Sequence, residues 1–186
     1  MNILALIIAR SGSKGLPNKN LLKIGNKTLI EYTIDVAKKA KLVSRIIFSS
    51  DSKQYGELAR KNGAEVPFLR PKKLAGDNVS SWDVVRHAVD WLDKKQKWKA
   101  DIIILMQPNT PLLQPEHIES VAKKIIYESY SAAITIREVD YPPEWMFHIN
   151  KQDRLIPILK NKKKNKQKTR WSTSISTGGD SIRCGI

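Results

Sequence analysis

The sequence predicts an α/β protein with an open, doubly wound and mostly parallel sheet, in a Rossmann-like three-layer sandwich. Three observations lead to this class: short aliphatic runs, amphipathic segments between them, and turn-forming residues where each run ends. Aliphatic runs without alternation are typical of strands that are covered on both faces, as in a parallel sheet. Strands that alternate with helices connect as βαβ units, so the same pattern also predicts the topology.

The N-terminal third of the chain predicts two strands and two helices. Residues 2–8 are a continuous aliphatic run and form the first strand. Residues 28–40 carry apolar side chains at helical spacing, with lysines at the end where the helix dipole favours cations. Residues 45–50 form the second strand, and residues 52–62 form a helix that Gly63 closes.

The alternation continues through the middle of the chain. The expected elements are a strand over residues 65–69, a helix over 80–95, a strand over 102–106, a helix over 115–130 with Pro in its first turn, and a strand over 132–137. The chain contains no internal repeat. Residues 1–159 are therefore predicted to be one domain, followed by an atypical tail over residues 160–186 that is first basic and then rich in Ser and Gly.

Charge favours a solvated tail over a nucleic-acid-binding protein. The net charge is +15, of which residues 151–186 contribute +8, and residues 160–170 hold seven cations and no acid. Such a run is more often a solvated segment than a polyanion-binding arm. An RNA-binding protein that depends on this run is the weakest alternative, and we expect no specific nucleic-acid partner.

Cysteine content and hydropathy indicate in which cellular compartment the protein is expected. A single cysteine, Cys184, excludes an internal disulfide framework and a Cys-rich zinc site. The apolar run over residues 3–9 is too short to cross a membrane and lacks the basic start of a signal peptide. The prediction is a cytoplasmic protein without a membrane partner.

Four loops follow the predicted strands at one edge of the sheet. They cover residues 9–20, 49–52, 70–81 and 107–113. Ligands of doubly wound sheets bind beyond the carboxyl ends of the strands. We therefore expect these loops to face one crevice.

The first of these loops has the chemistry of a phosphate site, although it matches neither G-x-x-x-x-G-K-[ST] nor G-x-G-x-x-G. Gly12 and Gly15 let backbone amides approach a phosphate chain, and Arg10, Lys14 and Lys19 supply positive charge. The alternative from the residues alone is a basic surface loop.

Five motifs in order make the resemblance to a known family specific. They are residues 9–20 (ARSGSKGLPNKN), Ser49-Ser50-Asp51, Arg70-Pro71 followed by Leu74-Ala75 and Asp77, Gln107-Pro108 with Thr110-Pro111-Leu112, and Pro143 to Trp145. In these motifs the chain resembles the acylneuraminate cytidylyltransferases, also called CMP-N-acetylneuraminate synthetases, over about residues 3–160.

The resemblance implies a fold like that of the nucleotide-diphospho-sugar transferases, and transfer of CMP from CTP to a nonulosonic, sialic-type acid with release of pyrophosphate. It also implies Mg²⁺, a homodimer, and a product used in surface glycan synthesis. By position, the implied catalytic residues are Arg10, Lys14 and Lys19. The implied nucleotide-binding residues are Arg10, Gly12, Ser13, Lys14, Gly15, Asn20, Arg70, Asp77 and Ser81. Gln107, Asn109 and Thr110 would bind the sugar acid, and Asp51 is the candidate metal ligand.

The chain departs from the family after about residue 160. Family members usually continue with an Arg-Arg-Gln-Asp-x-Pro segment, an Asn-Gly-Ala strand that precedes a late Asp-x-Asp pair for Mg²⁺, and a dimerisation segment, none of which occurs here. A truncation, or a reading-frame shift near residues 161–168, is the expectation for the tail. A CTP-binding protein without turnover and a ketodeoxyoctonate cytidylyltransferase remain the alternatives.

Overall fold

The computed structural model describes residues 1–12, 15–136, 142–143, 146–159 and 183–185. The chain divides into two compact units, Met1–Ser131 and Ala132–Ile186. The candidate site lies in the first unit. The predicted tail, apart from residues 183–185, lies outside the described residues, so the division into residues 1–159 and 160–186 stays a prediction.

The first unit alternates strands and helices as the sequence predicts. Its elements are β1 (Ile3–Ile8), the 3-10 helix η1 (Lys19–Leu21), β2 (Lys23–Ile24), β3 (Lys27–Thr28), α1 (Leu29–Lys39), β4 (Arg45–Ser49), α2 (Lys53–Lys61), the 3-10 helix η2 (Lys72–Leu74), α3 (Ser81–Gln96), β5 (Ile102–Met106) and α4 (Pro115–Glu128). None of the described helices is long and apolar enough to cross a bilayer.

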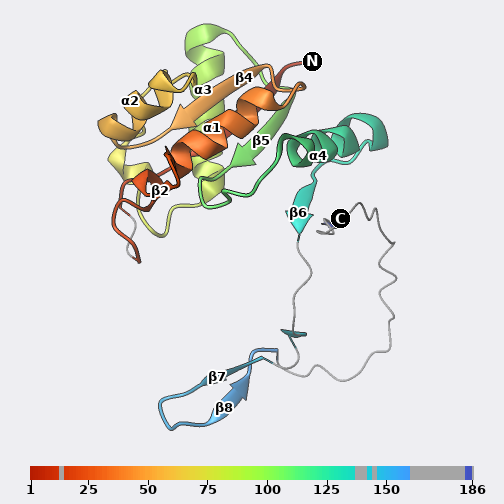
Figure 1. Ribbon diagram of the computed structural model, residues 1–186. Coiled ribbons are helices and arrows are strands. Elements are labelled where there is room, and N and C mark those ends of the chain that lie inside the picture. The colour runs from red at the N-terminus through yellow and green to blue at the C-terminus, as the bar shows by residue number, and fades with distance from the viewer. Residues whose placement is uncertain (13–14, 137–141, 144–145, 160–182, 186) are drawn as a thin grey trace. The chain divides into compact units, whose positions relative to one another are not determined.

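A parallel sheet with the order β4-β1-β5 forms the centre of this unit (Figure 1). Leu6 of β1 pairs with Ile47 of β4 on one side and with Leu105 of β5 on the other. The three predicted aliphatic runs are thus the three strands, and their parallel pairing is confirmed. The order places β1 in the middle, with β4 on one side of it and β5, which comes later in the chain, on the other.

Helices cover both faces of the sheet, which makes three layers (Figure 1). Ala5 and Ile7 of β1 face a core that includes buried residues of α1, α2 and α4. Leu4 and Leu6 point to the opposite face and pack with α3. Alternate side chains of one strand therefore enter two cores, which is why the strand is apolar at every position.

The helices begin and end close to the predicted positions because their flanking residues act as caps. The Thr28 side chain accepts a hydrogen bond from the Glu31 amide at 3.3 Å, and the Ser52 hydroxyl accepts one from the Tyr55 amide at 3.3 Å. α4 ends at Glu128, two residues before the prediction, since Ser129 adopts a left-handed conformation with φ 58°.

The predicted strand over residues 65–69 is wrong as a regular strand. Glu65 forms an isolated parallel bridge with Ile47, and the Arg70 amide donates to the Ser50 carbonyl at 2.8 Å. Between these contacts Pro67 has no N–H group to donate to a ladder. The segment therefore runs beside β4 without completing a ladder.

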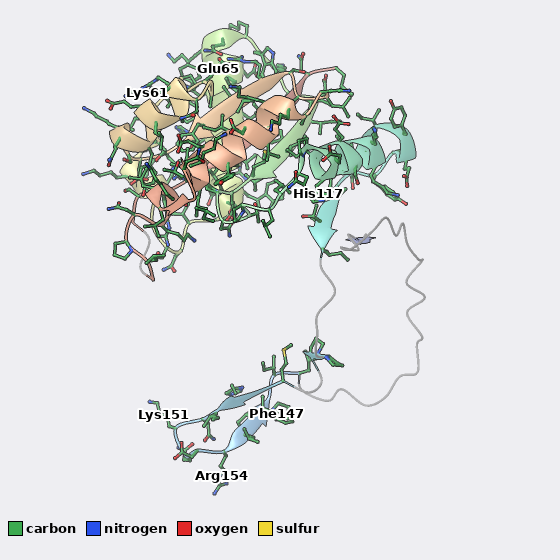
Figure 2. All side chains as sticks on the ribbon, in the orientation of Figure 1. Lys61, Glu65, His117, Phe147, Lys151 and Arg154 are labelled. Atoms are coloured by element: carbon green, nitrogen blue, oxygen red, sulfur yellow. The ribbon has the colours of Figure 1, made fainter. Side chains whose placement is uncertain are left out.

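The second unit contains short antiparallel pairs. Its elements are β6 (Ile134–Ile136), β7 (Phe147–Ile149), β8 (Leu155–Pro157) and β9 (Arg183–Gly185). The predicted strand over residues 132–137 is found as the shorter β6, which pairs with β9, and β7 pairs with β8. Figure 2 shows Lys151 and Arg154 near the turn of the β7–β8 hairpin.

Candidate functional site

Two adjoining cavities lie where the chain leaves β1 and β5. Their volumes are about 180 Å³ and about 470 Å³, and both are lined by Ile8, Arg10 and Gln107. Arg10 follows β1 and Gln107 follows β5, so both cavities lie at the carboxyl edge of the parallel sheet. This is the position at which doubly wound sheets bind ligands.

The loop over residues 9–20 is anchored at both ends. At its start, the Ala9 amide donates to the Ser49 carbonyl at 3.1 Å. At its end, the buried Asn20 donates from its side-chain amide to the Arg10 carbonyl at 3.3 Å. Asn18 adopts a left-handed conformation with φ 51° and accepts a long hydrogen bond, 3.5 Å, from the hydroxyl of the buried Tyr55. The described part of the loop is therefore fixed to β4 and α2.

Two arginines line the smaller cavity, and they differ in exposure to solvent. Arg10 forms an ion pair with Asp77 and is partly exposed, whereas Arg70 is 4% exposed. Ser81, the first residue of α3, lines the same cavity. The loop over residues 70–81 therefore faces the start of the first loop, as the sequence predicts.

Arg70 is buried without enough hydrogen-bond acceptors. Within the part of the chain that the structure describes, its Nε and Nη2 atoms are buried and have no hydrogen-bond partner. Its Nη2 atom lies 3.8 Å from an oxygen of Asp51, which is an ion-pair distance and not a hydrogen bond. Burial lowers the pKa of the Arg70 guanidinium below its ordinary value, Asp51 opposes this effect, and Arg10 adds to it. A buried donor without an acceptor is rare in native proteins and calls for an explanation, such as an ordered water, an ion or a functional role.

His87 is a residue of α3 near Arg70, and its ring packs against the ring of Phe68. Its ring meets Phe68 edge-on at a centroid distance of 4.8 Å. Burial lowers the pKa of His87, and the charge of Arg70 lowers it further. His87 is therefore neutral at neutral pH, which lets it lie beside the buried cation.

Asp51 connects the first loop to Arg70. One carboxylate oxygen accepts the Ser11 amide at 3.0 Å, and the other accepts the Ser11 hydroxyl at 2.7 Å. Burial alone would raise the pKa of Asp51, but the hydrogen bonds from Ser11 and the charge of Arg70 bring it below its ordinary value. Asp51 is therefore ionised at neutral pH.

The larger cavity is lined by the end of the first loop and by the loop after β5. Its lining includes Gly15, Lys19 and Asn20 on one side and Pro108 and Asn109 on the other. The ammonium group of Lys19 and the exposed backbone near Gly15 are the groups that bind phosphate oxygens in proteins. This cavity has the chemistry of a polyanion site beside the guanidinium of Arg10.

Residues of the loop after β5 divide into lining and supporting positions. Gln107 lines both cavities and Asn109 lines the larger one. Thr110 is not among the lining residues, and its hydroxyl donates to the Gln107 carbonyl at 3.1 Å. Thr110 thus holds the turn that presents Gln107 and Asn109.

The structure brings together most of the residues that the sequence predicts. Gly12 is described but is not among the lining residues of either cavity, and nothing would meet a Cβ atom within 4 Å of it. Ser13 and Lys14 lie outside the described residues. Sequence reasoning missed Ser11 and Tyr55 as supports of the loop. Only the inward position of Tyr55 on its helix could have indicated its role.

The described residues do not by themselves fit a Mg²⁺ ion. Both oxygens of the predicted ligand, Asp51, already accept hydrogen bonds from Ser11, and a guanidinium lies 3.8 Å away. In the described segments no group of three or more His, Cys, Asp or Glu side chains could hold a metal ion. Mg²⁺ usually keeps several waters and binds one or two carboxylates together with substrate phosphates, so Asp51 alone would need the phosphates of a bound nucleotide to complete a site.

Comparison with known proteins shows the family to which this chain is similar. The family model for cytidylyltransferases matches residues 4–173. An N-acylneuraminate cytidylyltransferase of Escherichia coli O18:K1:H7 is 36% identical over 76% of this chain and 33% of its own length. A CMP-N,N'-diacetyllegionaminic acid synthase of Legionella pneumophila is 36% identical over 84% of this chain and 66% of its own length. The chain thus spans between one third and about two thirds of these relatives.

Solved structures share the fold. A CMP:2-keto-3-deoxy-manno-octonic acid synthetase in complex with CTP superposes with a TM-score of 0.59 at 24% identity, and the match covers 73% of this chain and 52% of that chain. A 4-diphosphocytidyl-2C-methyl-D-erythritol synthase gives a TM-score of 0.52 at 17% identity over 75% of this chain and 64% of that chain. The fold is therefore that of the nucleotide-diphospho-sugar transferases, and the chain belongs to the cytidylyltransferase family.

Proposed function

We propose that this chain is a cytidylyltransferase that transfers CMP from CTP to a nonulosonic acid of the sialic type and releases pyrophosphate. The observation that carries the proposal is the crevice in which Arg10 lies between a cavity with the buried Arg70 and a cavity with Lys19. A pseudaminic acid cytidylyltransferase of Campylobacter jejuni, 32% identical over 83% of this chain, supports the class of sugar acid, together with the two relatives described above.

The two cavities suggest how the nucleotide lies. The nucleoside end would occupy the smaller cavity, where Arg70, Asp77 and Ser81 surround it. The phosphates would pass Arg10 into the larger cavity, where Lys19 and the backbone near Gly15 bind them. In this proposal Asn20 contacts the nucleotide, and Gly12, Ser13 and Lys14 complete the phosphate loop.

The sugar acid would enter beside the loop after β5. Gln107 and Asn109 offer amide groups that donate to and accept from its hydroxyl and carboxylate oxygens. Thr110 would contribute by holding the turn. The sugar acid would then lie next to Arg10, where the α-phosphate is expected.

The proposed reaction is a displacement at the α-phosphorus of CTP. A hydroxyl oxygen of the sugar acid forms a bond to this phosphorus, the bond between the phosphorus and the oxygen that bridges to the β-phosphate breaks, and its electron pair leaves with pyrophosphate. The hydroxyl proton passes to solvent water. Negative charge grows on the leaving pyrophosphate, and Arg10, Lys14 and Lys19 would stabilise it. Positioning and charge stabilisation contribute most of the catalysis in reactions of this type.

Mg²⁺ belongs to the proposal as a partner of the triphosphate. When bound, it would neutralise charge on the phosphate oxygens. The described residues do not form its complete site, so the roles above are assigned to this chain's own cations. A homodimer, a cytoplasmic location and a product for surface glycans are further parts of the proposal.

The test is release of pyrophosphate from CTP and Mg²⁺ in the presence of single sugar acids. We expect release with N-acetylneuraminic, legionaminic or pseudaminic acid. Release with ketodeoxyoctonate alone would favour a ketodeoxyoctonate cytidylyltransferase. CTP binding without any release would favour a binding protein, and absence of CTP binding would contradict the proposed site.

Lys19 offers a sharper test of the phosphate position. Lys19→Gln removes a charge from the larger cavity, so we expect CTP affinity to fall about tenfold, the loss of one charge-assisted hydrogen bond, while cytidine affinity is unchanged. Lys23→Gln is the matched control, because Lys23 is an exposed lysine on β2 and lines neither cavity. Calorimetry with both ligands measures the difference; equal losses in the two variants would refute the assignment.

A further inference from the structure

Asp51 occupies an unusual place for a carboxylate, because its partners belong to two separate loops. It lies two residues after the end of β4, and its side chain is 15% exposed. Both of its oxygens are occupied by Ser11, through the amide at 3.0 Å and the hydroxyl at 2.7 Å. These contacts join residues that are 40 positions apart in the sequence. They fix the first loop immediately after Arg10.

The same carboxylate is the negative charge beside Arg70. The oxygen that accepts the Ser11 amide lies 3.8 Å from Nη2 of Arg70. Asp77 already pairs with Arg10, and Arg10 and Arg70 line one cavity. Two like charges near each other in a poorly solvated place need compensation. Asp51 supplies it for Arg70 at an ion-pair distance of 3.8 Å, without a hydrogen bond to the guanidinium.

The backbone of the Arg70 segment reaches the same strand end. The Arg70 amide donates to the Ser50 carbonyl at 2.8 Å, next to Asp51 in the chain. The backbone of Arg70 is thus already fixed to the end of β4, and Asp51 acts on the guanidinium. The first loop and the Arg70 segment therefore share one support.

We infer that Asp51 is a positioning residue that couples the phosphate end of the nucleotide site, through Ser11, to the nucleoside end, through Arg70. This inference rests on the proposed function for the identity of the ligand. It assigns Asp51 a role that needs no metal ion. One carboxylate thereby fixes the positions of two parts of the ligand site relative to each other.

The experiment compares Asp51→Asn and Asp51→Ala with the wild-type chain by calorimetry, in EDTA, with CTP, cytidine and inorganic triphosphate as separate ligands. Asp51→Asn keeps an acceptor for Ser11 but loses the charge beside Arg70. The affinity for cytidine should therefore fall at least tenfold, and the affinity for triphosphate less than threefold. Asp51→Ala loses both the acceptor for Ser11 and the charge beside Arg70, so the affinity for each of the three ligands should fall at least tenfold.

Asp35 provides a matched control. It is a partly exposed carboxylate of α1 that pairs with Lys27 at 2.5 Å and lines neither cavity. We expect Asp35→Asn and Asp35→Ala to leave all three affinities within twofold. A similar loss in the Asp35 variants would mean that the effect reflects general stability. Asp51 variants that bind normally in EDTA and weakly only with Mg²⁺ would identify a metal ligand. Either result overturns the inference.

Hydrogen exchange tests the support without any nucleotide. The Ser11 amide should exchange at least tenfold faster in Asp51→Ala than in the wild-type chain, and at an unchanged rate in Asp35→Ala, because Asp51 accepts this amide's hydrogen bond. If the wild-type chain does not bind CTP, the proposed function fails, and this measurement still decides the role of Asp51. Unchanged exchange at Ser11 in Asp51→Ala would overturn it.

Discussion

At the residue level, Arg70 is the group whose surroundings are hardest to explain by folding alone. It is 4% exposed and has two buried nitrogen atoms without partners in the described part of the chain. An unpaired buried donor destabilises a folded protein by about 1–3 kcal/mol. Such a group is understandable when a ligand supplies the acceptor, and residues at binding sites commonly lower stability in exchange for function.

Arg70→Met should therefore separate stability from binding. Methionine can fill the space of the stem and removes two buried donors without partners in the described chain, a gain that opposes the cost of leaving Asp51 without its cation, so we expect the free energy of unfolding to change by less than about 1 kcal/mol. CTP affinity should fall at least tenfold, because the buried donors are lost. Urea unfolding and calorimetry measure the two quantities.

Arg60→Met is the corresponding control for the loss of an arginine. Arg60 is exposed on α2 and donates to the Val66 carbonyl at 2.9 Å. Its replacement should lower the free energy of unfolding by about 0.5–1.5 kcal/mol and leave CTP affinity unchanged. A loss of stability in Arg70→Met that exceeds this, with normal CTP binding, would show that Arg70 is a structural residue.

At the level of elements, helix caps near the site decide where each loop ends. α1 has a reciprocal cap, in which the Thr28 amide donates to the Glu31 carboxylate at 2.6 Å and the Glu31 amide donates to the Thr28 hydroxyl. The hydrogen bond from the Thr28 amide, with a further contribution from the Thr28 side chain, lowers the pKa of Glu31. This cap begins α1 directly after β3, which follows the anchored first loop.

The pKa of Glu31 gives a prediction with a definite sign. Since its folded value lies below the unfolded value of about 4.3, ionised Glu31 stabilises the fold above that pH, and this stabilisation disappears as pH falls through the folded value. Glu31→Gln should lower the free energy of unfolding by about 0.3–1 kcal/mol at pH 7 and by less at pH 3. Urea titrations at both pH values measure it, and an equal difference at both would contradict the role of the charge.

At the level of the whole molecule, both hydrophobic cores lie within the first unit. The core on the α1 face includes Met106 and Ile118, and the core on the α3 face includes Leu92. No residue of either core comes from Ala132–Ile186 in the described parts of the chain. The first unit should therefore fold by itself.

A chain of residues 1–131 tests this expectation. We predict one cooperative thermal transition with a midpoint within about 4 °C of the full chain, the shift that roughly 1 kcal/mol produces in a protein of this size. A chain of residues 1–101 is the control, since it lacks β5 and α4 and should show no cooperative transition. Failure of residues 1–131 to unfold cooperatively would show that the second unit contributes to the core.

The regular elements were predictable because local physics determines them. The aliphatic run before Ala9 is a strand covered on both faces, and Thr28, Ser52 and Ser80, residue types that favour caps, lie at the starts of the predicted helices. The segment over residues 65–69 escaped this logic. Its residues favour a strand, but a ladder needs an N–H group where Pro67 has none.

The sequence by itself determined the fold class, and it predicted the edge of the sheet at which the two cavities lie and the cationic residues Arg10 and Lys19 that line them. Only the tertiary structure decided that Asp51 contacts both Ser11 and Arg70, and that Arg70 is buried with donors that have no partner among the described residues. The reason is physical: strands and caps depend on residues within a few positions of one another. A hydrogen bond across 40 positions depends on how the strands pair, which no local pattern specifies.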